Sequence, residues 1–213
     1  MATTTVPAPL DSPPGLASRS YPALPADQAW PAQGQWTYDD FLRLPDDAMR
    51  YEIIDGVLYM SNAPEPGHQY AVVQITFAIE AAVRAGNLGV VYTAPIEVHL
   101  PAIAQPVQPD ILFIAADRRH MVRDKFIEGA PDLIVEVTSP STARADRKVK
   151  FDAYERAGVR EYWIANPRTR FVEVYSLARG EYALRGEYGP DQQVASDVLP
   201  GLALLADAIF TLA

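Results

Sequence analysis

The sequence predicts a mixed α/β fold, with one central mixed sheet flanked by helices. An Asp55-Gly56 pair between β-forming residues is typical of a tight hairpin turn. Apolar residues recur at helical spacing over 68–85, and the apolar run at 132–138 is typical of a buried strand. Helices and strands mixed in this order indicate an α+β or mixed α/β domain.

Local signals define the other expected elements. Thr37 stands in an N-cap position before two aspartates, which predicts a short first helix that Pro45 ends. Gly86-Asn87 ends the long helix, and Gly158 ends a further helix over 144–157. The sequence also predicts strands at 51–54, 57–60, 89–93, 96–100, 110–115, 132–138, 160–165, 171–176 and 182–185, a short helical or irregular stretch at 118–127, and a last short helix within 202–212.

Composition favours one domain preceded by a tail. Of the 213 residues, 49% are apolar and 21% are charged, which is enough for a sizeable core. Residues 1–34 are rich in proline and alanine, and we expect them to form a flexible tail before a single domain at 35–213. The alternative is that this segment lies over a partner subunit through Tyr21, Leu24 and Trp30.

Several classes of protein are excluded or disfavoured by composition. The chain has no cysteine, which excludes disulfides, zinc–thiolate sites and cysteine nucleophiles. It has no apolar stretch near the roughly 20 residues that span a bilayer and no secretory signal pattern, so we expect a cytoplasmic protein without a membrane partner. The net charge of -9 disfavours a broad basic surface for nucleic acid, but it fits a cluster of carboxylates that holds a divalent cation.

Two acidic residues stand in strongly apolar surroundings. Asp110 opens the apolar strand 110–115, and Glu136 lies inside the strand 132–138, on the same face as Ile134. A buried carboxylate is unfavourable unless a cation or a hydrogen-bond donor compensates it. On adjacent strands, the two carboxylates could converge on one hard cation and leave room for water and a phosphate oxygen.

The helix that follows adds a cation. Asp146, Lys150 and Tyr154 are four residues apart and therefore share one helical face. Lys150 is expected near the boundary between core and solvent, where its ammonium could orient an attacking water or stabilise charge on a phosphate.

Each of these residues also has a purely structural interpretation. Asp146 and Lys150 could form an ordinary surface pair, with Tyr154 half-buried beside them. Glu136 could belong to an ion pair, and Asp110 could be a turn residue. A second Pro-Asp pair contains Asp132, which lies one strand-length from Glu136; we expect it to begin that strand and to stay outside the site.

Several motifs together resemble one family. They are Tyr51–Gly56, His68, Gln108–Leu112, Pro131–Thr142, Asp146, Lys150, Tyr154 and Ala157–Ile164. In order and spacing they are similar to the Uma2-type family of proposed restriction endonucleases, which is also catalogued as a domain of unknown function in the PD-(D/E)XK nuclease superfamily. The resemblance covers about residues 36–210 and implies a restriction-endonuclease-like fold with the site at one edge of the sheet.

The resemblance implies a set of metal ligands. Asp110 and Glu136 correspond to the two motif acids, and Glu52 resembles the additional acid near the N-terminus that extends the metal site. The implied cofactor is one or two divalent ions, Mg²⁺ or Mn²⁺.

The resemblance is incomplete at the lysine. The superfamily pattern has a lysine two residues after the motif glutamate, and here that position is Thr138. Lys150 on the next helix is the apparent substitute. His68, at the start of the first long helix, could face the same cleft, or it could be a solvent-facing residue.

The function implied is that of a metal-dependent endonuclease that hydrolyses phosphodiester bonds in nucleic acid, with DNA as the expected substrate and a homodimer as a possible assembly. Two alternatives stay open. The domain could keep the nuclease fold as a binding or assembly module without turnover. It could also be an oligomeric interaction protein, such as a partner of another nuclease or a toxin–antitoxin-like component, with an aromatic interface in its C-terminal strands.

Overall fold

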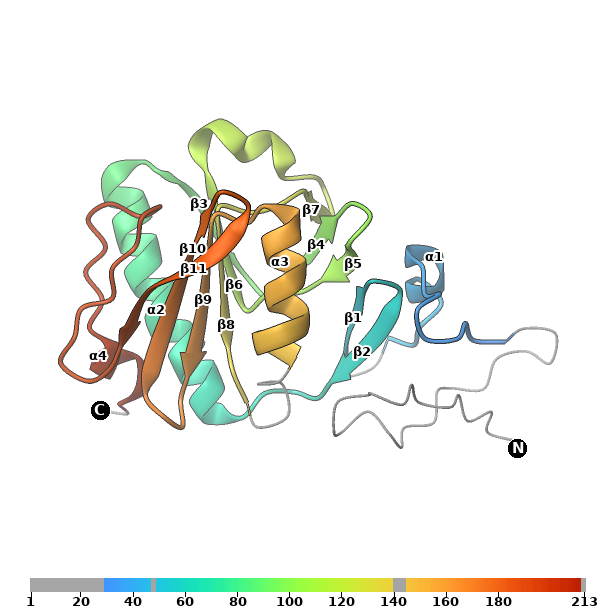
Figure 1. Ribbon diagram of the computed structural model, residues 1–213, viewed down its shortest axis with the longest axis horizontal. Coiled ribbons are helices and arrows are strands. Elements are labelled where there is room, and N and C mark those ends of the chain that lie inside the picture. Colours follow the sequence, from blue (N-terminus) through green and yellow to red (C-terminus); the bar gives the residue numbers. More distant parts are fainter. Residues whose placement is uncertain (1–28, 47–48, 140–144, 212–213) are drawn as a thin grey trace.

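Two mixed sheets and their covering helices form the fold in the computed structural model, which describes residues 29–46, 49–139 and 145–211 (Figure 1). No helix in these ranges is both long and apolar enough to cross a bilayer. The elements are α1 (Tyr38–Phe41), β1 (Arg50–Ile54), β2 (Val57–Ser61), α2 (Pro66–Gly86), β3 (Gly89–Thr93), β4 (Glu97–Leu100), β5 (Ala104–Val107), β6 (Ile111–Ala115), η1 (Ala116–Met121, a 3-10 helix), β7 (Phe126–Glu128), β8 (Leu133–Val137), η2 (Ala145–Lys150, a π-helix), α3 (Phe151–Ala157), β9 (Glu161–Asn166), β10 (Phe171–Ala178), β11 (Glu181–Tyr188) and α4 (Ala206–Phe210).

The larger sheet has six strands in the order β11-β10-β9-β8-β6-β3. Neighbouring strands in this sheet run antiparallel, except for β8 and β9, which run parallel. Both faces of this sheet are buried, as the alternating side chains of β8 show. Leu133, Val135 and Val137 pack in the core with α2 and α4. Ile134 points to the other face and packs in the core with α3 and the second sheet. The predicted strand at 132–138 and its alternation are confirmed.

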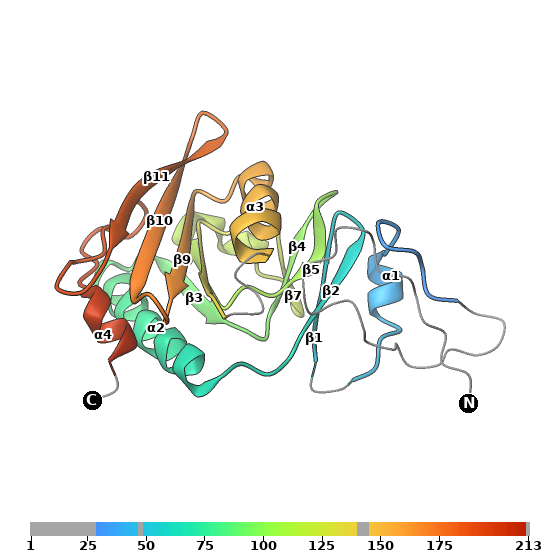
Figure 2. The same cartoon turned by 60° about the horizontal axis from the view of Figure 1, so that its bottom comes forward.

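The smaller sheet has five strands in the order β2-β1-β5-β4-β7. Figure 2 shows it beside α3, on the opposite side of the larger sheet from α2 and α4. The β1–β2 hairpin turns at Asp55 and Gly56, whose φ angles of 50° and 70° are both left-handed, as the predicted tight turn requires. A Cβ at Gly56 would also lie 2.5 Å from the carbonyl oxygen of Gly34, so a side chain is excluded there.

The mixed α/β class with a central mixed sheet flanked by helices is confirmed, and the chain forms a second, smaller sheet that was not expected. Two strands of the second sheet were not predicted. Strand β5 contains Pro106, which lowers the apparent strand propensity, and β7 has three residues. The stretch predicted as helical or irregular at 118–127 divides into η1 and β7, and the helix predicted at 144–157 begins as the π-helix η2.

The first described residues pack on the domain. Trp30 stacks on Trp36 with a centroid distance of 5.3 Å, and the side chain of Gln33 bonds both backbone groups of Leu58. The part of the expected tail at 29–34 is therefore folded against β2. The remainder of that tail, with Tyr21 and Leu24, lies outside the described residues.

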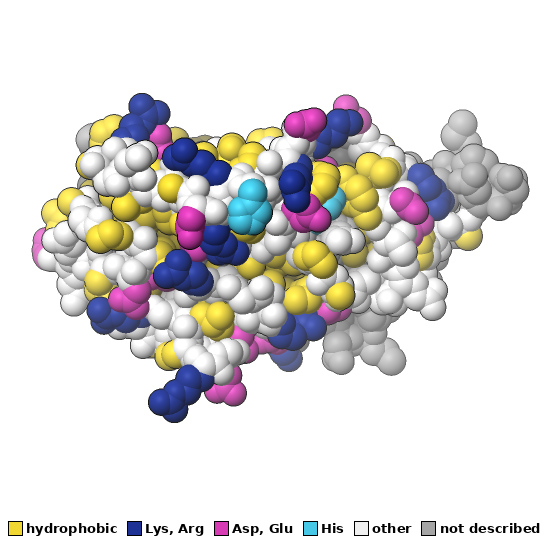
Figure 3. Space-filling model, turned by 90° about the horizontal axis from the view of Figure 1, so that it is seen from above, with side chains coloured by type: hydrophobic (Ala, Val, Ile, Leu, Met, Phe, Trp, Pro, Cys, Tyr) yellow, Lys and Arg dark blue, Asp and Glu magenta, His cyan; other side chains and the backbone are white. Residues whose placement is uncertain are grey.

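Asp132 lies at the opposite end of β8 from Glu136. It is fully buried, accepts the Ala115 N–H at 2.8 Å, and pairs with Arg118 at 2.8 Å and Arg160 at 3.1 Å. It begins the strand, as predicted, and its contacts join β8 to neighbouring elements. Figure 3 looks onto the molecule from above, where η1 lies in Figure 1, and shows lysine and arginine side chains intermingled with acidic ones.

Replacing Trp30 by alanine should lower the free energy of unfolding by about 2–4 kcal/mol, because a buried indole and its stack on Trp36 are lost. Urea denaturation measures this change. Leu42→Ala is the control: the side chain is 64% exposed, and its loss should change stability by about 0.5 kcal/mol or less. Equal effects of the two substitutions would contradict the packing of residues 29–34.

Candidate functional site

Strand pairing brings the two predicted acids together. Strand β6 runs antiparallel to β8 with Ile111 opposite Val135, so Asp110, just before β6, reaches the end of β8. There the Val137 N–H donates to Asp110 Oδ2 at 2.9 Å. Glu136 is the neighbouring residue, on the face of the larger sheet that packs against α3. The two carboxylates therefore lie side by side at the ends of adjacent strands, and their convergence on one cation stays a prediction.

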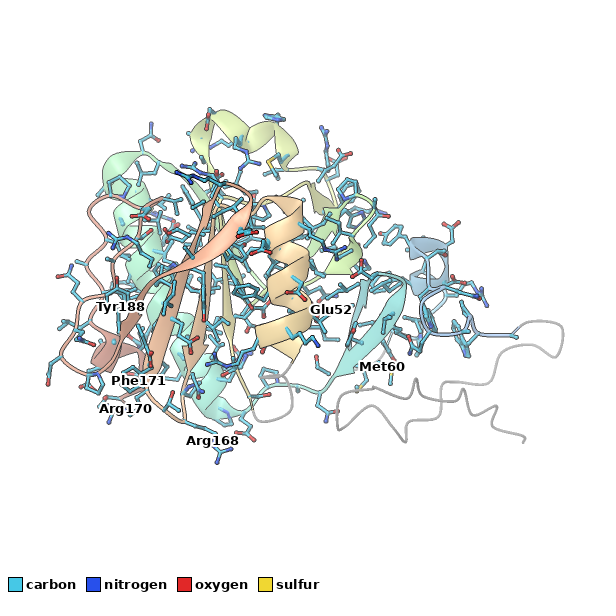
Figure 4. All side chains as sticks on the ribbon, viewed as in Figure 1. Glu52, Met60, Arg168, Arg170, Phe171 and Tyr188 are labelled. Carbon is cyan, nitrogen blue, oxygen red and sulfur yellow. The ribbon has the colours of Figure 1, made fainter. Side chains whose placement is uncertain are left out.

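Strand β1 of the second sheet contributes a third carboxylate. Glu52 is 6% exposed, and its Oε1 atom accepts the Gln108 N–H at 2.7 Å. In Figure 4, Glu52 lies between β1 and α3. The same Oε1 atom is 3.0 Å from Lys150 Nζ, which links the two sheets through the helix.

Lys150 is the centre of the cluster. Its side chain is 7% exposed, and its ammonium lies 3.0 Å from Oε1 of Glu136 and 4.0 Å from Oδ1 of Asp146. One turn later, the hydroxyl of Tyr154 donates to the same Glu136 oxygen at 2.8 Å. The surface-pair interpretation of Asp146, Lys150 and Tyr154 is therefore wrong, because all three side chains are buried.

Asp110 has two basic partners of its own. Arg50 Nη1 is 3.0 Å from Oδ1, and His68 Nε2 is 3.1 Å from Oδ2. His68 is therefore a member of the cluster, with a side chain that is 10% exposed, and not a solvent-facing residue. Its other ring nitrogen, Nδ1, is buried without a hydrogen-bond partner among the described residues.

The carboxylates respond to burial in opposite ways. Burial raises the pKa of Asp110, but the hydrogen bond and charge of His68, helped by Arg50 and Lys150, outweigh it and lower that pKa to about 2. Burial raises the pKa of Glu136 well above its usual range; Lys150 opposes this, whereas the charges of Asp110, Asp146 and Glu52 add to it. The negative charge of Glu136 is thus less well compensated than that of Asp110.

The donor set is that of a hard cation. Glu52, Asp110, Glu136 and Asp146 are all buried and offer carboxylate oxygens, which Mg²⁺ and Mn²⁺ prefer. Within the ranges that the structure describes, however, no three carboxylate or histidine side chains gather closely enough to hold a metal ion together. The ammonium of Lys150 is the positive group that contacts Glu52 and Glu136 instead. The oxygen ligands that these four carboxylates offer suit a divalent ion, and the ammonium of Lys150 already lies among them.

Sequence reasoning found the acids, the lysine and Tyr154 but missed Arg50. A signal was available, because Arg50 and Glu52 are two residues apart in a strand and share one face. Thr138, at the position where the superfamily pattern has lysine, is 4% exposed just beyond β8, and its N–H donates to the Ala165 carbonyl at 2.8 Å. The ammonium reaches the acids from η2 instead.

Comparison with known proteins assigns this mixed α/β domain, with its buried acidic cluster, to a family. The chain belongs to the Uma2 family, whose model, described as "Putative restriction endonuclease", matches residues 38–208. The fold is shared with the crystal structure of a "putative nuclease belonging to DUF820" from Anabaena variabilis, with a TM-score of 0.68 at 20% sequence identity, over 82% of this chain and 97% of that one. Among curated proteins, no match to the sequence was found.

Tyr154→Phe should destabilise the protein by about 1.5–3 kcal/mol, because Glu136 loses a buried donor to a charged group. Urea unfolding in the presence of EDTA measures the effect. Tyr70→Phe is the matched control, since that hydroxyl donates to the exposed Thr211 carbonyl at 2.8 Å and should contribute about 1 kcal/mol or less. If the two variants were equally stable, Tyr154 would not support Glu136 as described.

Proposed function

We propose that the protein is a metal-dependent endonuclease that hydrolyses phosphodiester bonds in DNA. Asp110, Glu136 and Glu52 would hold one or two Mg²⁺ or Mn²⁺ ions. The observation that carries the proposal is the burial of these carboxylates around one lysine, at the edge where β8 ends, in a chain of the Uma2 family. Asp110, Glu136 and Lys150 are the proposed catalytic residues.

When bound, a divalent ion would polarise the scissile phosphate and lower the pKa of a bound water. The chain's own groups would position the reactants. Lys150 would orient the attacking water or stabilise negative charge on the phosphate. Tyr154 holds Glu136, and Arg50 and His68 hold Asp110, so these three act as positioning residues for the two acids.

A scaffold without turnover is the second candidate. Thr138 in place of the motif lysine and the engagement of Lys150 by carboxylates favour it. The retention of four buried acidic side chains disfavours it, since a pure scaffold does not need a cluster whose charge is compensated incompletely. A homodimeric assembly and a cytoplasmic setting stay predictions.

The direct test is an assay of supercoiled, linear and single-stranded DNA with Mg²⁺ or Mn²⁺. Glu136→Gln and Lys150→Ala should each lower the cleavage rate at least about a hundredfold, because each removes a charge aimed at the reacting phosphate or its metal. Arg179→Gln is the control and should cleave at the wild-type rate. Arg179 follows β10 at the other edge of the sheet, where Ser176 lies opposite Glu161.

Cleavage that survives Glu136→Gln would show that the activity comes from another site or another protein. No cleavage by any form, together with no calorimetric Mn²⁺ binding, would favour the scaffold over the nuclease.

A further inference from the structure

Lys150 holds two of the proposed metal ligands itself. Its single nitrogen lies 3.0 Å from Glu52 Oε1 and 3.0 Å from Glu136 Oε1, although these residues belong to different sheets. A metal ion that bound the same two oxygens would have to displace the ammonium of Lys150 from them.

The contacts of Lys150 differ from those of Arg50, the other fixed cation. Arg50 donates both to Asp110 and to the backbone carbonyl of Gln108 at 3.3 Å, so it is tied to the chain independently of the acid. Within the described part of the chain, the polar partners of Lys150 Nζ are the carboxylates of Glu52, Glu136 and Asp146. The lysine side chain is flexible and its ammonium is a compact point charge, so it can leave these partners by rotation about its own bonds.

The charges give a reason for such an exchange. The ammonium of Lys150 contacts three carboxylates, and a fourth, Asp110, is close enough to affect it. A buried carboxylate that lacks a full counter-charge is unfavourable. A divalent ion brings twice the charge of the ammonium and would compensate the cluster more completely.

We propose that Lys150 is the internal counter-ion of the metal-free site, that it competes with a divalent ion for Glu52 and Glu136, and that metal binding releases its ammonium to contact a phosphate of the substrate. The inference rests on the proposed function and deepens it. It makes metal binding and the placement of the catalytic lysine a single event, because the same oxygens cannot serve both cations fully.

The first test is a calorimetric Mn²⁺ titration of Lys150→Met. Loss of the competitor should tighten Mn²⁺ binding about tenfold or more relative to wild type, a coupling of ordinary size between two ligands. Lys148→Met is the control, because Lys148 lies two residues earlier and is exposed. This substitution removes the same formal charge as Lys150→Met. It should bind Mn²⁺ almost as the wild type does, since an exposed charge is largely screened.

The second test uses the wild-type protein and does not depend on the folding of a variant. Acetylation by an N-hydroxysuccinimide ester, followed by mass spectrometry, reports how accessible each lysine is. Lys150 should be protected in EDTA and label several-fold faster in Mn²⁺, whereas Lys148 should label at one rate in both.

Failure of this inference is distinguishable from failure of the proposed function. Mn²⁺ binding by the wild type, with unchanged labelling of Lys150 and no tighter binding by Lys150→Met, would overturn the competition and leave the metal site standing. If Lys150→Met did not fold, the labelling result alone would decide. No Mn²⁺ binding by any form would overturn both proposals.

Discussion

The shortage of positive charge around Lys150 is the constraint on which the site depends. Four carboxylates are buried at the edge where β8 ends, and removing one ion from water costs several kcal/mol unless it is paired. The fold meets this cost with groups from different layers: Tyr154 from α3, the Val137 N–H from the larger sheet, and Arg50 from the smaller one. The raised pKa of Glu136 shows where compensation is still incomplete. Well-packed apolar residues in place of buried ion pairs are often neutral or stabilising, so stability alone does not account for these acids.

Architecture follows from the same requirement. The larger sheet carries α2 and α4 on one face, where α2 contributes His68 to the contacts of Asp110. Its other face is shared by α3 and the smaller sheet. Glu52 lies between these two layers (Figure 4), and it contacts the ammonium of Lys150 at 3.0 Å. Because β1 belongs to the second sheet, the position of Glu52 depends on how that sheet packs. The two-sheet arrangement is therefore part of the site and not an addition to a single central sheet.

Much of this could be read from the sequence, for definable reasons. Strand alternation placed Glu136 on one face, and helical spacing placed Lys150 and Tyr154 together, because both periods are local properties. The second sheet could not be foreseen, because its strands are short and their pairing is non-local. The ammonium between Glu52 and Glu136 was equally hidden, since it depends on the distance between two sheets. Arg50 was missed although its spacing from Glu52 was visible.

The most direct test of the account is anomalous diffraction from crystals of the wild-type protein grown with Mn²⁺. The account predicts an anomalous peak among the carboxylates of Asp110, Glu136 and Glu52, with the ammonium of Lys150 withdrawn from at least one of them. A peak at another place, or none among these side chains under conditions in which the protein binds Mn²⁺ in solution, would contradict the assignment of the metal site.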